Sequence, residues 1–361
     1  MKRMFFLMIT AVLIMALLTG CAGTVVVVGD CTCPTAGNSV ADSTTLPNVG
    51  DGETPLKIGL AVSTKISDSV SATAEANGAA AYDITIAAVT VDENGVIRSC
   101  KVDSVPATVN FDAAGQIVTD LTAVIDTKNE KGENYGMVAW GGAIAEWDAQ
   151  VAALCNFAVG KTVEELKNGA VAESGYAPEG TDLASSATIY LGGYVAVIEA
   201  AVNNAKYLGA VDGDALELVT LNSVASSVSA TEEKDGTAQL DANIAVVTVN
   251  EGVITSCVID AVQAKIGFDA AGAITTDLTA SVQTKNELGE GYGMKAWGGA
   301  IAEWNEQAAS FAAYVTGKTA GEVAGIAVTE STKPADGTDL ASSVTIAVGG
   351  FQALIAKVFG K

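Results

Sequence analysis

The chain repeats itself at a constant spacing. Residues 180–189 read GTDLASSATI and residues 337–346 read GTDLASSVTI, and Tyr135 recurs as Tyr292, 157 positions later (292 − 135). A fixed offset maintained over this length predicts one domain that is built twice. Each copy is then expected to form its own core and to bind or carry the same thing.

Within each copy, strand patterns come before helix patterns. Residues 84–91 and 96–103 alternate in polarity around Asp92-Glu93-Asn94-Gly95, and residues 244–249 and 253–259 do so around a turn that is one residue shorter. Such runs around a turn containing Gly predict antiparallel hairpins. Further short strands are expected at residues 108–111 and 116–119.

Helical spacing follows these strands. Apolar residues recur at helical intervals in both copies, at Ile144, Trp147, Val151 and Leu154 and again at Ile301, Trp304, Ala308 and Phe311. Capping boxes at residues 162–165 and 319–322 predict a second helix, and residues 194–206 and 351–359 predict a closing helix. The expected fold class is α+β, with two tandem repeats that each form an antiparallel sheet covered by helices.

The start of the chain has the pattern of an export signal. Lys2 and Arg3 precede an apolar run from residue 4 to residue 18, which is short for a membrane span. Leu18-Thr19-Gly20-Cys21 resembles the lipobox of bacterial lipoproteins, which implies lipidation of Cys21 and an extracytoplasmic protein anchored to the cell membrane. The alternative is a signal anchor that is not cleaved.

These observations divide the chain into four segments. Residues 1–20 are the expected signal peptide, and residues 21–55, rich in Gly, Ser, Thr, Asp and Pro, are the expected flexible tether. The two repeats then occupy residues 56–209 and 210–361.

Composition excludes several classes of function. The chain has 42 acidic and 19 basic residues, a net charge of −23, and no histidine. Such an acidic surface repels phosphate groups, so no nucleic-acid partner is expected. Without histidine, Ser-His-Asp and Cys-His catalysis and most zinc or haem ligation are excluded. We predict no catalytic residue and no metal site; at Asp212-Gly-Asp214 a solvated linker is favoured over a calcium site.

The six cysteines do not form a repeated disulfide framework. Cys100 and Cys257 hold equivalent positions on a predicted strand, whereas Cys155 is matched by Ala312. We interpret Cys100 and Cys257 as small buried apolar residues, with a redox role as the alternative.

The strand hairpin, a Gly-rich loop and the late cassette together resemble the extracytoplasmic FMN-binding domain family. In that family, an Asp-x-x-Ser/Thr-Gly-Ala-Thr segment precedes a helix, and a flavin transferase esterifies FMN through its phosphate to the final threonine. The resemblance implies covalent FMN on Thr188 and Thr345. The other matching cassette residues are Asp182, Ser185, Asp339 and Ser342.

Three positions depart from the family pattern. Ser186 and Ser343 stand where the family has Gly, and Val344 stands where it has Ala. If that Gly serves a special backbone angle or the close approach of the transferase, a serine would hinder attachment. In the alternative interpretation, Asp182 and Ser185 only supply turn and capping oxygens before the closing helix.

A second block is also repeated, as YGMVAWGGAIAEW at residues 135–147 and YGMKAWGGAIAEW at residues 292–304. The loop before it, residues 284–291, resembles the Gly-rich loop with which the family approaches the isoalloxazine ring. Aromatic and thioether side chains beside glycines suit a planar ring. The candidate ring contacts are Tyr135, Met137, Trp140, Tyr292, Met294 and Trp297, with core packing as the alternative; Trp147 and Trp304 are interpreted as core.

The combined expectation is a membrane-anchored surface lipoprotein with two FMN-binding-like domains that acts as an extracytoplasmic electron carrier. Carrier or binding activity is favoured over enzymatic turnover. The implied partners are the flavin transferase and a membrane or extracellular redox partner. The alternative is a cofactor-free surface lipoprotein with a structural or interaction role, which binds a ligand or a partner.

Overall fold

The predicted hairpins are long antiparallel strands in two separate sheets. The computed structural model describes residue 50 and residues 53–360. One sheet has the order β3-β2-β1-β4 and the other has the order β5-β6-β7, with antiparallel pairing throughout. The strands are β1 (Pro55–Lys65), β2 (Gly78–Val91), β3 (Ile97–Phe111), β4 (Lys206–Val211), β5 (Ala215–Ser223), β6 (Gly236–Asn250) and β7 (Val253–Phe268).

The helices follow the strands in each half of the chain. After β3 come α1 (Lys128–Lys131), the 3-10 helix η1 (Gly132–Tyr135), α2 (Met137–Gly141), α3 (Trp147–Ala158), α4 (Val163–Ala170), α5 (Asp182–Ser186) and α6 (Gly192–Asn203). After β7 come α7 (Lys285–Leu288), η2 (Gly289–Tyr292), α8 (Met294–Gly298), α9 (Trp304–Val315), α10 (Ala320–Ala324), η3 (Leu340–Ser342) and α11 (Gly349–Phe359). The protein is therefore a mixed α and β structure with two antiparallel sheets.

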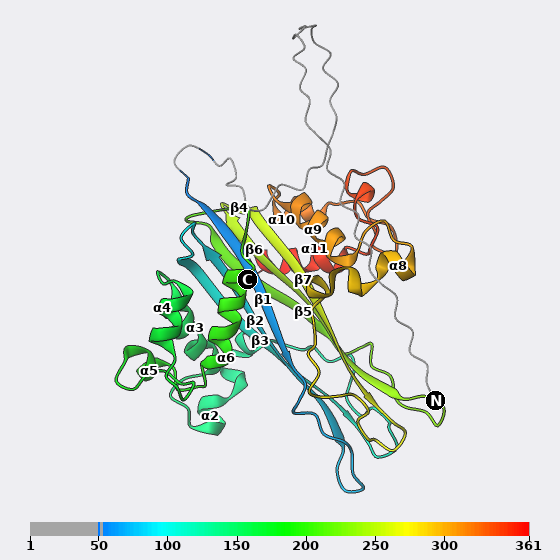
Figure 1. Cartoon of the computed structure of the whole chain (residues 1–361). Helices are drawn as coiled ribbons and strands as arrows, with labels where there is room; N and C mark the ends of the chain where they lie inside the picture. The colour runs from blue at the N-terminus through cyan, green and yellow to red at the C-terminus, as the bar shows by residue number, and fades with distance from the viewer. Residues whose placement is uncertain (1–49, 51–52, 361) are drawn as a thin grey trace, which may run out of the picture. The chain divides into compact units, whose positions relative to one another are not determined.

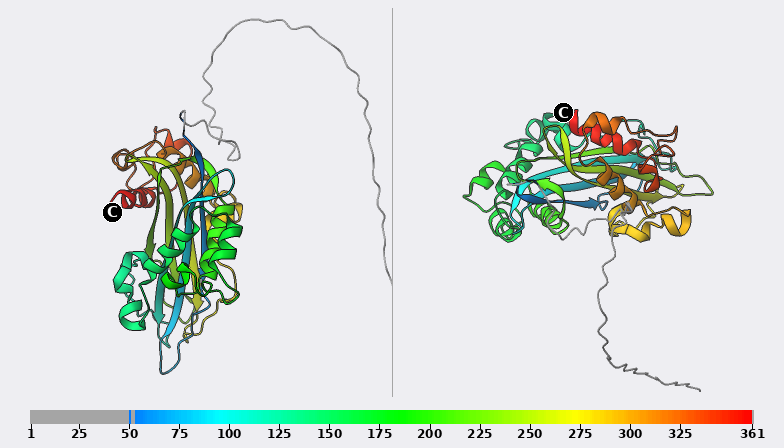
Figure 2. Two further views of the ribbon diagram at one scale, coloured as in Figure 1. Left: turned by 90° about the vertical axis from the view of Figure 1, so that its left-hand side faces the viewer. Right: turned by 90° about the horizontal axis from the view of Figure 1, so that it is seen from above.

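The two sheets pack against each other through their inner faces. Alternate residues of β2, including Ile84 and Ile86, share one buried cluster with alternate residues of β6 and β7, including Ile244 and Ile266. We call this cluster the inner core. Figure 1 shows the long strands of both sheets running together, with α3–α6 on one side and α8–α11 on the other. Figure 2 shows the same strands from two further directions.

The ring pair Phe111–Phe268 lies within the inner core. Both rings are fully buried, their centroids are 4.1 Å apart and their planes differ by 2°. Each phenylalanine is the last residue of its strand, β3 or β7. Because Phe111 and Phe268 hold equivalent positions in the two halves, each ring packs on its own counterpart.

Loops beside this ring pair exchange reciprocal hydrogen bonds. The Ala72 N–H donates to the Gly272 carbonyl, and the Ala230 N–H donates to the Gly115 carbonyl, both at 2.8 Å. Gly115 and Gly272 have positive φ, and a Cβ on either would meet an alanine Cβ of the other half at 2.7 or 2.6 Å. Glycine is therefore required at both Gly115 and Gly272, because any side chain there would prevent the loops of the two halves from approaching so closely.

The outer face of each sheet is covered by the helices of its own half. Trp147 and Leu154 of α3 and Ile198 of α6 pack on Val89 of β2 in one buried cluster. Trp304 and Phe311 of α9 and Leu354 of α11 pack on Val247 of β6 in another. We call these the outer clusters of the first and second half. Together with the inner core, they bury both faces of both sheets.

Most predicted elements are confirmed, including both hairpins, the positive φ of Gly95 in the first turn and the two capping boxes. Two details are wrong. Residues 116–119 form no strand, only an isolated bridge from Ile117 to Phe111, because Asp112 binds the Gln116 N–H within a tight turn. Ile144 and Ile301 precede the helices they were assigned to, and more than half of each side chain is exposed.

Several sequence expectations fall on other parts of the chain. Residues 1–49, which contain the expected signal peptide, Cys21 and most of the expected tether, lie outside the described residues. The expected boundary between residues 209 and 210 lies inside β4, which pairs with β1. Among the described residues, no helix is both long and apolar enough to cross a bilayer.

Shortening either ring of the Phe111–Phe268 pair should destabilise the whole fold. We expect Phe111→Ala or Phe268→Ala to lower the free energy of unfolding by about 3–5 kcal/mol, measured by urea denaturation. The double variant should lose less than the sum, because the two rings contact each other. Phe157→Ala, a half-buried ring on α3, is the matched control and should cost less. Equal losses at all three positions would contradict a special role for the pair.

Candidate functional site

The two cassette threonines are held in the same way by a buried glutamine. Gln150 of α3 accepts the Thr188 backbone N–H at 2.8 Å and its hydroxyl at 3.3 Å; Gln307 of α9 does the same for Thr345 at 2.7 and 3.2 Å. Both glutamines have no exposed surface, whereas Thr188 is exposed and Thr345 is half-buried. Each threonine hydroxyl is therefore placed at the surface by an amide that is fixed in the core.

The glutamines are themselves fixed by the loop before their helix. Gln150 donates through Nε2 to the Ala145 carbonyl, and Gln307 donates to the Ala302 carbonyl, both at 2.8 Å. A buried amide that keeps both its donor and its acceptor paired avoids the free-energy cost of an unsatisfied polar group, about 1–3 kcal/mol. The pairing makes the threonine position rigid.

The rest of the cassette forms a short helical turn. Thr181, not Asp182, accepts the capping N–H, from Ala184 at 3.2 Å. The Ser185 and Ser186 hydroxyls donate back to the Asp182 carbonyl at 2.9 and 3.1 Å. The alternative interpretation of Asp182 as a capping residue is therefore wrong for its side chain, which is exposed at the start of α5.

The second cassette repeats this arrangement with a looser turn. Thr338 accepts the Ala341 N–H at 3.4 Å, and the Ser342 hydroxyl donates to the Asp339 carbonyl at 2.7 Å. The Asp339 side chain makes no capping hydrogen bond. In both halves, the acidic side chain of the cassette remains on the surface.

The serines that replace the family's glycine carry no backbone strain. Ser343 has φ −121°, and neither Ser186 nor Ser343 is among the residues with positive φ. Any L-residue adopts this backbone, so a glycine-specific angle is not needed here. The third departure is a core position, because Val344 is fully buried in the cluster beneath α9 and α11.

A second set of side chains surrounds the start of α3. Trp147 is only 3% exposed, and its indole N–H donates to the Tyr194 hydroxyl of α6 at 2.9 Å. Trp147 and Gln150 are three residues apart on α3 and so lie on the same side of the helix. The core interpretation of Trp147 and Trp304 is confirmed, since Trp304 is 6% exposed.

The remaining residues of the repeated block divide into two kinds. Tyr135 and Met137 are half-buried against the outer cluster, as are Tyr292 and Met294 in the second half. Trp140 and Trp297 are instead 90% and 91% exposed. Each indole lies over a glycine of positive φ, Gly136 or Gly293, where a Cβ would come within 2.3 Å of the ring.

The short helices that carry these exposed tryptophans are capped from a distance. Glu146 accepts the Met137 and Val138 N–H groups at 2.8 and 2.9 Å, and Glu303 accepts those of Met294 and Lys295 at 2.7 and 3.0 Å. A carboxylate at a helix start is favourable because the first N–H groups lack intrahelical partners. Glu146 also precedes α3, so one residue orients both helices.

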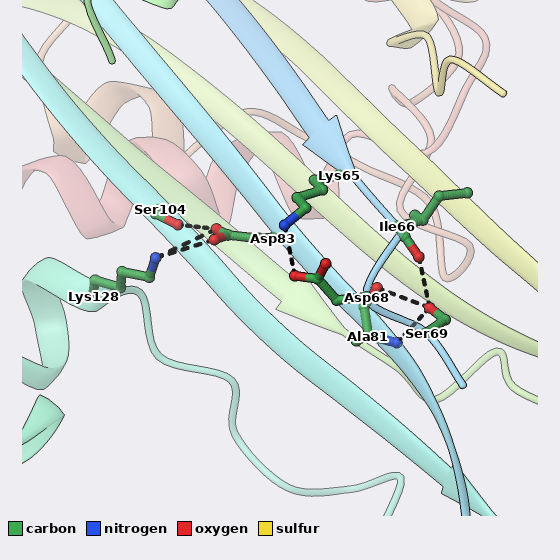
Figure 3. Close-up of polar contacts among 8 residues, drawn as sticks. All are labelled: Lys65, Ile66, Asp68, Ser69, Ala81, Asp83, Ser104 and Lys128. Atoms are coloured by element: carbon green, nitrogen blue, oxygen red, sulfur yellow. Dashed lines mark hydrogen bonds and ion pairs between the residues drawn. The ribbon is translucent and has the colours of Figure 1, made fainter. Parts of the chain in front are cut away.

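A buried lysine lies against the aromatic residues. The Lys128 ammonium is 5.2 Å from the Trp147 ring centroid, 5.6 Å from that of Tyr135 and 3.2 Å from an Asp83 oxygen. Figure 3 shows Lys128 and Ser104 pointing toward the Asp83 carboxylate, both from the same side. Burial lowers the pKa of Lys128, but Asp83, Tyr194 and Tyr135 raise it more, so the net shift is upward. The ammonium therefore stays charged.

The second half keeps the lysine but changes its surroundings. Lys285 is 4.9 Å from the Tyr292 ring centroid and 5.0 Å from that of Trp304. Phe351 takes the place of Tyr194 and meets Trp304 edge to face at 5.8 Å. The two pockets around the lysine therefore differ in polarity, while the pairing of lysine with Trp and Tyr is retained.

A buried carboxylate positions each lysine loop. Asp103 accepts the Asn129 N–H at 3.1 Å, and Asp260 accepts the Asn286 N–H at 3.0 Å. Burial raises the pKa of Asp260 from its ordinary 3.8 to about 6, against the lowering effect of hydrogen bonds from Asn286, Thr284 and Ala261. Burial raises the pKa of Asp103 in the same way.

The helices after the cassettes begin without a side-chain cap. The first residues of α6 are Gly192 and Gly193, and those of α11 are Gly349 and Gly350, four residues after Thr188 and Thr345 respectively. The backbone N–H groups at such a helix start attract anions, including phosphate. In α6 the Gly192 N–H already donates to the Gly175 carbonyl at 3.0 Å, so it is not one of the groups open to an anion.

Sequence reasoning missed the residues that organise this site. They are Gln150 and Gln307, Glu146 and Glu303, and Lys128 and Lys285. Each pair is identical in both halves at the same 157-residue offset, for example 307 − 150. A search for polar residues that recur at that offset would have found all six.

The arrangement offers binding and attachment more readily than acid–base chemistry. Each half presents a fixed hydroxyl, an aromatic surface and a lysine, which is buried in the first half and half-buried in the second. In the described region, no cluster of three acidic or cysteine side chains could hold a metal ion. Asp212 pairs with Arg98 at 2.9 Å, and Asp214 accepts from Val211, Asn250 and Thr255, so these two aspartates serve the turn between β4 and β5.

No protein-family model matches this chain, and neither does any curated protein or solved structure.

The buried carboxylate of Asp260 should make stability depend on pH. Because its pKa is higher in the folded protein than in the unfolded chain, its stabilising contribution is full below about pH 4 and is lost as pH rises through about 6. A shift of this size corresponds to about 3 kcal/mol. The unfolding free energy of the wild type relative to Asp260→Asn should fall by about that amount over this range.

The control for this titration is Asp336→Asn, which removes the same charge at an exposed position. Its stability relative to the wild type should change little over the same pH range, because solvent screens that charge. Parallel pH profiles for the wild type and Asp260→Asn would show that the Asp260 carboxyl does not titrate in the folded protein as argued.

Proposed function

We propose that this protein is an extracytoplasmic, lipid-anchored flavoprotein whose two halves are copies of one FMN-binding-like domain, each an antiparallel sheet covered by helices. Thr188 and Thr345 are the attachment residues for FMN. The protein then carries electrons between a membrane or extracellular donor and an acceptor. A flavin transferase is required to form the phosphoester bond to each hydroxyl.

The observation that carries the proposal is the pairing of each threonine with a buried glutamine. The Thr188 and Thr345 hydroxyls donate their protons to a glutamine oxygen, which leaves the hydroxyl lone pairs directed away from that contact. An amide oxygen is too weak a base to remove the proton, so the transferase must do so. This protein therefore positions the threonine hydroxyl, and the transferase removes the proton and forms the phosphoester bond.

The surrounding residues fit a flavin phosphate. Attachment replaces the hydroxyl proton, so the Thr188 hydroxyl contact to Gln150 is lost while the backbone N–H contact at 2.8 Å remains to hold the residue. The N-terminus of α6 lies four residues later and has no side-chain cap; the Gly192 N–H donates to the Gly175 carbonyl at 3.0 Å, so a phosphate there would use the following N–H groups. The Ser186 hydroxyl donates to the Asp182 carbonyl, and Thr188 remains exposed.

The exposed aromatic groups of each half fit a planar ring. Trp140 and Trp297 present whole indoles to solvent on helices that are fixed by Glu146 and Glu303. Exposed aromatic surface of this kind suits stacking with an isoalloxazine ring or a docked redox partner. When FMN is bound it supplies the electron chemistry, and the protein residues fix its position and charge environment.

The attachment test uses the full chain, expressed and exported in a host that contains a flavin transferase. Intact mass and visible absorbance should give two flavins per chain for the wild type, one for Thr188→Ala or Thr345→Ala, and none for the double variant. A colourless wild-type chain with no flavin mass increment would reject the proposal and leave the cofactor-free binding role.

The glutamine contact has its own test. We expect Gln150→Leu to lower flavin occupancy at Thr188 at least several-fold while Thr345 stays fully occupied, because only the first threonine loses its acceptor. Gln307→Leu should give the reverse pattern. Peptide mapping measures the two sites separately, so each half is the control for the other. Unchanged occupancy at both threonines would show that the glutamines are structural only.

A further inference from the structure

Two cysteines, Cys100 and Cys155, line one cavity in the first half of the chain. Cys100 lies on β3 and Cys155 lies on α3, both side chains line the same cavity, and Cys155 is near enough to raise the pKa of Cys100. Both residues pack in the outer cluster between the sheet and the helices. No position in the flavin proposal uses either thiol.

The cavity gives small molecules access to the pair. It has a volume of about 700 Å³, and its lining includes Val151 and Leu218 beside the two cysteines. Asn156 and Gly360, which also line it, are exposed, so the cavity reaches the protein surface. Lys101 and Lys357 line it together with the acidic residues Asp103, Glu130 and Asp148, so its wall carries both signs of charge.

The second half lacks this pair. The positions that match Cys100 and Cys155 are Cys257 on β7 and Ala312 on α9. Cys257 is 3% exposed and packs among apolar side chains. The pair is therefore specific to the first half, and Cys257 is a natural single-thiol control within the same chain.

We propose that Cys100 and Cys155 form a disulfide bond that joins α3 to β3. The oxidant is a small disulfide such as oxidised glutathione. One protein thiol, as its thiolate, attacks a glutathione sulfur and releases one glutathione thiolate. The other protein thiolate then attacks the protein sulfur of the mixed disulfide and releases the second.

Atoms and electrons balance in this thiol–disulfide exchange. Two protein thiols are oxidised, one glutathione disulfide is reduced to two glutathiones, and the two thiol protons pass to the released thiolates through solvent. This inference does not rest on flavin attachment.

The local environment sets the rate of this reaction. The neighbouring Cys155 thiol, together with burial, raises the pKa of Cys100 well above its ordinary value. Because thiolates, not thiols, carry out the exchange, closure should be slow near neutral pH and faster as pH rises. The cavity admits the oxidant, while the pKa limits how often the attacking form is present.

The bond would act on the site through α3. Cys155 lies five residues after Gln150 on the same 12-residue helix. A covalent link from α3 to β3 would restrict movement of the helix that positions Thr188. The equivalent helix α9 has no such restraint, so the two threonine sites would differ in rigidity under oxidising conditions.

The test is peptide mapping of the intact chain after incubation with oxidised glutathione. Trypsin places Cys100 in residues 99–101 and Cys155 in residues 132–161, with no other cysteine in either peptide. The expected product is these two peptides joined, with the loss of two hydrogen atoms and no added glutathione. Cys257, in residues 235–265, should remain alkylatable by iodoacetamide after denaturation.

Two outcomes would overturn the proposal. One is recovery of Cys100 and Cys155 as free or singly glutathionylated peptides at all pH values at which the fold is retained. The other is a link from either residue to Cys257 or to a cysteine before residue 50. Cys155→Ala serves as a further control, because Cys100 should then give only a mixed disulfide, which dithiothreitol removes.

Discussion

The contact between the inner faces of the two sheets is the constraint on which the rest of the structure depends. Each sheet has apolar residues on both faces, so neither face can be left in water. The helices of one half cover only one face of its own sheet. The other face is covered by the sheet from the other half, which makes the two halves mutually necessary for burial.

Packing at this contact also explains several local features. The Phe111–Phe268 pair fills the end of the inner core, and the loops beside it approach so closely that Gly115 and Gly272 have no room for a side chain. Lys101 pairs with Glu217 at 2.9 Å across the same junction. Because the Lys101 and Glu217 side chains are 42% and 24% exposed, the salt bridge contributes less than the apolar burial does.

The polar residues that are identical in both halves share one property. Gln150, Glu146 and Asp103, and their counterparts, each accept hydrogen bonds from backbone N–H groups of a neighbouring loop. Replacing any of them leaves backbone N–H donors without this partner, which is most costly where the donor is shielded from water. The lysine pockets, where Tyr194 is replaced by Phe351, vary more because the change keeps the ring and the packing.

Local sequence patterns predicted the elements well, and long-range contacts poorly. Alternation around Asp92–Gly95 was enough to place the hairpin, and capping boxes were enough to place helix starts, because both signals lie within a few residues. Ile144 was assigned to α3 by spacing alone. The helix begins later because Glu146 is engaged with the N–H groups of Met137 and Val138, a contact that periodicity does not encode.

The candidate site was predicted in the same uneven way. The two cassettes and the repeated aromatic block are contiguous in sequence, so Thr188 and Trp140 could be named as candidates from these segments; both are exposed in the structure. The residues that hold them lie up to 38 positions away, as Gln150 does from Thr188. Cys100 and Cys155 likewise line one cavity because α3 packs against β3. The spacing of the two cysteines in the sequence does not predict this.

The placement of the two threonines has a consequence for communication between them. Thr188 lies in the helix layer on one outside face of the paired sheets, and Thr345 lies in the helix layer on the opposite outside face. With about 10 Å between successive layers, the two are separated by roughly 30 Å of packed protein. Two unit charges at that distance interact by only about 0.5 kcal/mol even at an effective dielectric constant of 20. The two hydroxyls are therefore electrostatically almost independent. A group at one threonine can take up or release charge with little effect on the charge equilibrium of a group at the other.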